Sequence, residues 1–168
     1  MAKKRTAHKA PRGGTYIGLT DGEREAVARR LGVILADEVL LYIKTRNFHW
    51  NVVGKDFSEL HKFFEAQYEA LDEVFDDVAE RMRALGERAP GSMAEFQALA
   101  RLSEKSGAAT AASDMLGTLL DDHETLIRAL RNDIVAIGKT ADVGTEDFLT
   151  GLLENHEKMA WMLRAYHG

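Results

Sequence analysis

The sequence predicts an all-α fold, a bundle of four long helices with a short helix in the crossover between the second and the third. Apolar residues recur at helical spacing in four long stretches, and no stretch has the two-residue alternation of a half-buried strand. Only two prolines interrupt the 168 residues, so long helices can run without a break. A chain of this length forms one domain with a sizeable core, which we expect to span residues 20–168.

The first two long helices are marked by start and stop signals. Thr20-Asp21-Gly22-Glu23 has the order of a capping box, and apolar residues follow at helical spacing to about His49. Gly54 breaks this pattern, and Asp56 can begin a second helix. That helix is expected to stop at Gly86.

The other helices follow from the same kind of signal. Ser92-Met93-Ala94-Glu95 is a second capping sequence, on a short helix of two or three turns. A third long helix is expected from about Thr110 or Ser113 to Ile137, and a fourth from near Thr145. The short helix fits the crossover that a bundle needs when two neighbouring helices run in the same sense.

Charge is unevenly distributed along the chain. The formal net charge is −5, but the first 20 residues are all basic or uncharged, so the remainder carries −10. Residues 1–19 also contain Pro11, Gly13 and Gly14, and we expect them to form a flexible arm. The basic residues of this arm are Lys3, Lys4, Arg5, Lys9 and Arg12.

Composition excludes several classes of site. With no cysteine, the chain has no disulfides, thiolate zinc sites or cysteine nucleophiles, so a metal would have to bind imidazole and carboxylate. No apolar run is long enough to span a bilayer, and the basic start lacks the apolar region of a signal peptide. We expect a cytoplasmic protein with no membrane partner.

Five possible metal ligands lie in the middle of the chain: His49, His61, Glu65, Asp76 and Glu80. On a helix, His61 and Glu65 share a face, and Asp76 and Glu80 share it again further along. His61 and Glu80 are nevertheless separated by roughly 28 Å along the helix axis. Because metal–ligand distances are about 2.0–2.2 Å, one chain cannot close both pairs around one metal.

A second copy of the chain removes this difficulty. An antiparallel two-fold partner centred near residue 70 would place the first pair opposite the second pair of its mate, giving two identical sites per dimer. His49 could add another imidazole, and such a mixed ligand set suits ferrous iron and its oxidation. The alternative is an ordinary solvated acidic face, with His61 on the surface and His49 bonded to a carbonyl.

The ligands stand among further motif residues: His49-Trp50-Asn51-x-x-Gly54, Phe57, Leu60-His61, Phe64, Tyr68, Asp76, Ala79-Glu80-Arg81, Asp122-His123-Glu124 and Trp161-Met162-Leu163. Together these residues resemble the ferroxidase signature of the Dps mini-ferritins, the DNA-binding proteins from starved cells. The resemblance implies a ferritin-like four-helix bundle that assembles into a hollow homododecamer. It also implies oxidation of Fe(II), preferably by hydrogen peroxide, storage of ferric mineral, and protection of DNA from oxidative damage.

The resemblance also assigns the ligands. His49, His61 and Glu65 would come from one chain and Asp76 and Glu80 from its mate, with iron as the metal and neither haem nor nucleotide required. Position 65 is most often aspartate in the family, and here it is glutamate. The longer glutamate can still bind iron, but it could change the distance between the two metals or the affinity of the weaker iron site. Trp50 would lie near the site, either scavenging oxidising equivalents or packing as an ordinary aromatic residue.

Two further assignments remain open. Asp142, Glu146 and Asp147 lie where the family lines its three-fold pores, but they could equally compensate the charge at a helix N-terminus. The basic arm resembles the lysine-rich extension through which some members bind DNA, a nonspecific and salt-dependent contact with phosphates. Such binding predicts association with the nucleoid.

Each assignment has a competing interpretation. The arm could be no more than a solubilising tail. The chain could also be mainly a nonspecific DNA-binding nucleoid protein with a metal site weakened by Glu65, or a plain helical interaction module.

Overall fold

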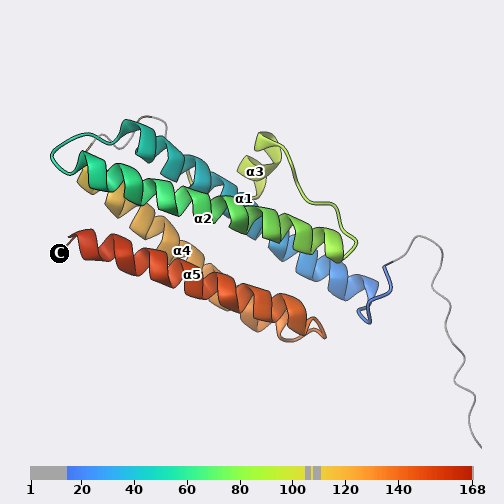
Figure 1. Cartoon of the computed structure of the whole chain (residues 1–168). Helices are drawn as coiled ribbons and strands as arrows, with labels where there is room; N and C mark the ends of the chain where they lie inside the picture. Colours follow the sequence, from blue (N-terminus) through green and yellow to red (C-terminus); the bar gives the residue numbers. More distant parts are fainter. Residues whose placement is uncertain (1–14, 105–106, 108–110, 168) are drawn as a thin grey trace, which may run out of the picture.

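The computed structural model describes residues 15–104, 107 and 111–167. It contains α1 (Asp21–Asn51), α2 (Phe57–Ala84), α3 (Met93–Leu99), α4 (Ala112–Ile137) and α5 (Val143–His167), and no strand among the described residues. Figure 1 shows two long helical hairpins, α1 with α2 and α4 with α5, packed together, while the short α3 lies against α1. The predicted four-helix bundle with a short crossover helix is confirmed.

Local chemistry sets several helix starts. The Thr20 side chain accepts a hydrogen bond from the Glu23 backbone and the Glu23 carboxylate binds back to Thr20, so the predicted capping box is present. Ser92 begins α3 in the same way. Asp56 stands at the N-cap of α2 but makes no side-chain capping bond.

The start of α5 differs from the prediction. The helix begins at Val143, two residues before the expected position near Thr145. Asp142 provides the reason, because its carboxylate accepts hydrogen bonds from the Thr145 backbone at 3.0 Å and the Thr145 hydroxyl at 2.6 Å. α4 begins at Ala112, between the two expected starts; Thr110 lies outside the described residues.

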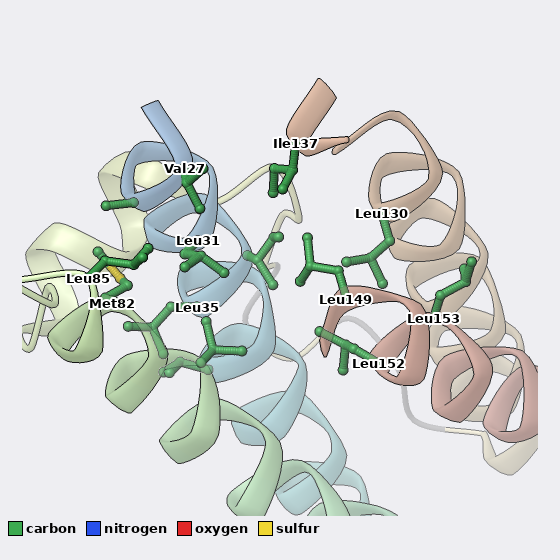
Figure 2. Close-up of a cluster of buried hydrophobic side chains, with 14 residues drawn as sticks. Val27, Leu31, Leu35, Met82, Leu85, Leu130, Ile137, Leu149, Leu152 and Leu153 are labelled. Atoms are coloured by element: carbon green, nitrogen blue, oxygen red, sulfur yellow. The ribbon is translucent and has the colours of Figure 1, made fainter. Parts of the chain in front are cut away.

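The core consists of two apolar clusters. In the first, shown in Figure 2, side chains of α1, α2, α4 and α5 meet around Leu31, Leu35 and Leu149. The second surrounds Phe64 and Leu119 toward the other end of the bundle. Along α1 the first cluster ends at Val39 and the second begins at Leu41, and buried polar residues lie near this boundary.

The crossover after α3 is anchored by one buried carboxylate. Asp37 of α1 is fully buried and accepts hydrogen bonds from the backbone N–H groups of Arg101 and Leu102 at 2.6 and 2.9 Å. It also binds the Arg101 guanidinium at 2.6 Å. Since hydrogen bonds to charged groups are among the stronger ones, Asp37 fixes the return of the chain toward α4.

Part of the expected arm contacts the bundle. Leu19 packs against the first cluster, and Thr15 lies so close to Gly86 that a Cβ at Gly86 would stand 2.1 Å from the Thr15 hydroxyl oxygen. Gly86 also has a φ of +86°, which favours glycine. The five basic residues of the arm lie outside the described residues.

Candidate metal centre

Two histidines from neighbouring helices lock each other in place. The rings of His49, in the last turn of α1, and His61, in the second turn of α2, stack with centroids 3.7 Å apart and planes at 23°. Nδ1 of His49 lies 2.8 Å from the carbonyl oxygen of His61, and Nδ1 of His61 lies 2.9 Å from that of His49. A carbonyl oxygen only accepts, so each Nδ1 carries the hydrogen.

This arrangement leaves both Nε2 atoms free to bind a metal. In a neutral imidazole with a proton on Nδ1, Nε2 presents a lone pair. Histidines that bind metals commonly donate their other N–H to a carbonyl or carboxylate, which fixes the ring orientation. The alternative interpretation of His49, a ring hydrogen-bonded to a carbonyl, is therefore seen in the structure. The same hydrogen bond is also expected of a histidine that binds a metal through its other ring nitrogen.

Glu65 lies one turn after His61 on α2 and is partly exposed. Its Oε1 is 3.4 Å from the Tyr68 hydroxyl, which can donate to it. Burial first, and the Glu65 charge second, raise the pKa of Tyr68 above its ordinary value of 10.0, so the phenol keeps its proton at neutral pH.

Asp76 and Glu80 lie further along α2, and both are exposed. Neither makes an ion pair or a side-chain hydrogen bond with other parts of the described chain. Within residues 15–104, 107 and 111–167, no three His, Asp or Glu side chains come together as a metal-binding group. The single chain thus pairs His49 with His61, places Glu65 one turn after His61 on α2, and leaves Asp76 and Glu80 further along that helix.

Arg46 contacts three aromatic rings, one of which, Tyr68, meets His49 edge-on. The Arg46 guanidinium lies 4.6 Å from the centroid of Tyr68 and 5.7 Å from those of Tyr42 and Trp50. Trp50 is 66% exposed, so it is not a core packing residue in the isolated chain. The scavenging role of Trp50 stays a prediction.

The three acidic residues near the start of α5 have different environments. Asp142 is buried, caps α5 and accepts a hydrogen bond from Arg81 at 2.7 Å. Glu146 is partly buried, while Asp147 is exposed beside a groove that it lines together with Asp77. Asp142 thus stabilises the N-terminus of α5, as the alternative interpretation expected. The assignment of all three residues to a pore stays a prediction.

The bundle also contains a buried chain of polar side chains that was not predicted from the sequence. His123 of α4 and His156 of α5 approach each other at 2.9 Å between their Nδ1 atoms, and Nε2 of His156 lies 2.8 Å from Oε1 of Glu38 in α1. All three residues are fully buried. Burial first, and His156 second, lower the pKa of His123 well below 6.5. A usable signal was available, because His123 occupies a core position in the helical repeat of α4 between Leu119 and Leu126.

No helix in the described part of the chain combines the length and apolar character needed to cross a membrane.

Comparison with known proteins places these features in a family. The model of the ferritin-like domain matches residues 29–168. An uncharacterized low temperature-induced protein of Nostoc is 48% identical over 151 residues, which cover 89% of this chain and 84% of the relative. The DNA protection during starvation protein of Helicobacter pylori is 33% identical over 131 residues, covering 78% and 91%.

A solved structure agrees with this placement. The Dps protein of Vibrio cholerae, described as a member of a broad superfamily of ferritin-like diiron-carboxylate proteins, superimposes with a TM-score of 0.88 at 30% identity. The match covers 96% of this chain and all of the Vibrio chain.

Proposed function

Because this chain belongs to the Dps family of ferritin-like proteins, we propose that it oxidises ferrous iron at sites shared by two copies of the chain. Family membership supports iron storage and DNA protection as the general role. The finer proposal adds hydrogen peroxide as the preferred oxidant and a dodecameric shell that holds the ferric product.

The histidine pair carries the proposal. His49 and His61 each have Nδ1 engaged with a carbonyl, which leaves the Nε2 lone pair of each ring available, and Glu65 lies one turn after His61 on the same helix. Two imidazoles and a carboxylate are ligands that suit ferrous iron. Three ligands form only part of a coordination sphere, and Asp76 and Glu80 remain without partners in the described chain.

A two-fold partner would complete the site. With an antiparallel copy centred near residue 70 of α2, Asp76 and Glu80 of one chain approach the histidine pair of the other. Two ferrous ions can then give one electron each to hydrogen peroxide, which is cleaved and takes up two protons to form two waters. The paired transfer avoids release of a hydroxyl radical, the species that damages DNA.

Mixing of inactive variants tests the sharing directly. His61→Ala and Asp76→Ala should each abolish rapid Fe(II) oxidation by peroxide in stopped-flow measurements. When the two variants are unfolded and refolded together, half of the dimers are mixed and each mixed dimer has one intact site. About a quarter of the wild-type sites should therefore reappear.

A matched mixture gives the control. His61→Ala refolded with Glu65→Ala should recover no activity, because both changes lie in the same half of the site. Equal recovery in the two mixtures, or wild-type rates in the single variants, would refute the shared site. A measured particle mass of twelve chains would support the proposed shell.

The charge distribution favours a second activity, nonspecific DNA binding by the arm. The five basic residues from Lys3 to Arg12 could neutralise phosphates, while the rest of the chain carries −10 and repels DNA. Twelve arms on one shell would strengthen a weak single contact. Deletion of residues 1–14 should abolish a gel shift at low salt and leave Fe(II) oxidation unchanged; an unchanged gel shift would exclude the arm as the DNA contact.

A further inference from the structure

We infer that Tyr68 is a positioning residue that holds Glu65 in the orientation needed to bind metal, an inference that rests on the proposed iron site. Tyr68 follows Glu65 by three residues on α2, so the two side chains lie on the same side of the helix. The Tyr68 hydroxyl, 3.4 Å from Oε1, is the only side-chain hydrogen-bond partner of Glu65 among the residues that the structure describes.

Tyr68 is itself held by three side chains of α1. Its ring meets Tyr42 edge-on at 6.2 Å and His49 edge-on at 5.2 Å between centroids. The Arg46 guanidinium lies 4.6 Å from the centre of the ring and also donates to the Tyr42 hydroxyl at 2.6 Å. These contacts restrict the ring, so the direction in which its hydroxyl points is set by α1.

The chemistry of the contact leaves a metal ligand available. A phenol that keeps its proton donates to Oε1, and Oε2 of Glu65 stays free. Ligating carboxylates are commonly oriented by such outer hydrogen bonds. At 3.4 Å the contact is longer than the usual 2.5–3.0 Å of an O–H···O bond, and we expect it to shorten when Glu65 binds a metal.

The length of Glu65 explains why such support matters here. Glutamate has one more rotatable bond than aspartate and loses more rotamer freedom when it is fixed. A donor three residues along the helix limits that freedom before metal arrives. An aspartate at position 65 would hold its carboxylate closer to the helix backbone and away from the Tyr68 hydroxyl, so the two residues should act as a unit.

Metal binding without oxidation tests the inference. The probe is Co(II), titrated into the assembled protein by calorimetry and followed by its visible absorption. Tyr68→Phe removes only the hydroxyl and keeps the ring contacts, and it should weaken Co(II) binding by about 2- to 10-fold, the range expected for one hydrogen bond. Tyr16→Phe, at a tyrosine that is 70% exposed, is the control and should match wild type.

A double-mutant cycle shows whether Tyr68 acts through Glu65. In a Glu65→Asp background, Tyr68→Phe should cause no further loss of affinity. Equal loss in both backgrounds would overturn the inference, as would wild-type affinity of the Tyr68→Phe protein. Thermal melting and particle mass of each variant check that it folds and assembles.

Failure of the underlying site gives a different result. His61→Ala should abolish the same Co(II) binding. If His61→Ala binds Co(II) like wild type, the proposed centre is wrong and the inferred role of Tyr68 is refuted as well. If His61→Ala loses binding and Tyr68→Phe does not, only the role of Tyr68 is refuted.

Discussion

Acid should destabilise this protein through one buried imidazole, His123. The folded protein keeps His123 neutral, because full burial and the adjacent His156 lower its pKa well below 6.5. In the unfolded chain the same side chain takes up a proton near its ordinary value of 6.5. The unfolded state therefore binds more protons as the pH falls through this range, and the free energy of unfolding decreases.

The size of the effect follows from one proton. Between pH 7.5 and 5.5, protonation of one histidine in the unfolded state alone lowers the free energy of unfolding by about 1.4 kcal/mol. For a chain of 168 residues this corresponds to a decrease in melting temperature of roughly 3–6 °C. The contribution is absent above about pH 7.5 and grows as the pH falls below 6.5.

His123→Gln isolates this contribution. Glutamine does not titrate, and its amide N–H can still donate to Nδ1 of His156, so the rest of the polar chain stays in place. The measurement is the melting temperature of both proteins at pH 7.5 and 5.5, at equal protein concentration so that any association between chains contributes equally. Wild type should lose about 1.4 kcal/mol more than the variant. Identical pH dependence in the two proteins would refute the reasoning.

Three further predictions concern stability and use the same melting assay or urea unfolding. Asp37→Ala should cost about 3 kcal/mol, because it removes the charged acceptor that anchors the crossover. Arg88→Ala removes an exposed ion pair with Glu95 and should leave the melting temperature nearly unchanged; equal effects of the two changes would contradict the anchoring role of Asp37. Asp142→Ala should lower the free energy of unfolding by about 1–2 kcal/mol, because α5 loses its cap. The control Asp147→Asn should leave the melting temperature unchanged. An Asp142→Ala protein as stable as wild type would contradict the capping role. Gly86→Ala should lower the free energy of unfolding by about 1–3 kcal/mol, because alanine is strained at a φ of +86° and its Cβ would clash with Thr15. Unchanged stability would show that the turn relaxes around the new side chain.

The predictable part of the fold is the part encoded by neighbouring residues. The capping boxes at Thr20 and Ser92 were correct because each depends on residues three apart in the sequence. The start of α5 was wrong by two residues because both Asp142 and Thr145 are capping types, and only the folded backbone shows that Asp142 accepts the bonds.

The sequence indicated the residue types of the candidate site, which stay a prediction, but not their local geometry. Ligand spacing indicated His49 and His61, but the reciprocal bonds between their rings and backbones join residues that meet only when α1 packs on α2. The place of His123 in the apolar repeat of α4 indicated burial, but it could not indicate the partners of the ring, which come from two other helices.

The reciprocal histidine bonds have a consequence for the order of events during biogenesis. They connect α1 and α2 across a short loop, so they can form as soon as this hairpin folds, before α4 and α5 dock and before any second chain is encountered. A newly made chain would then carry two imidazoles already oriented to bind a metal before it meets a second chain. If the proposed iron site and shell are both correct, binding of iron to single chains and assembly of the particle would compete in time, and the outcome would depend on chain concentration.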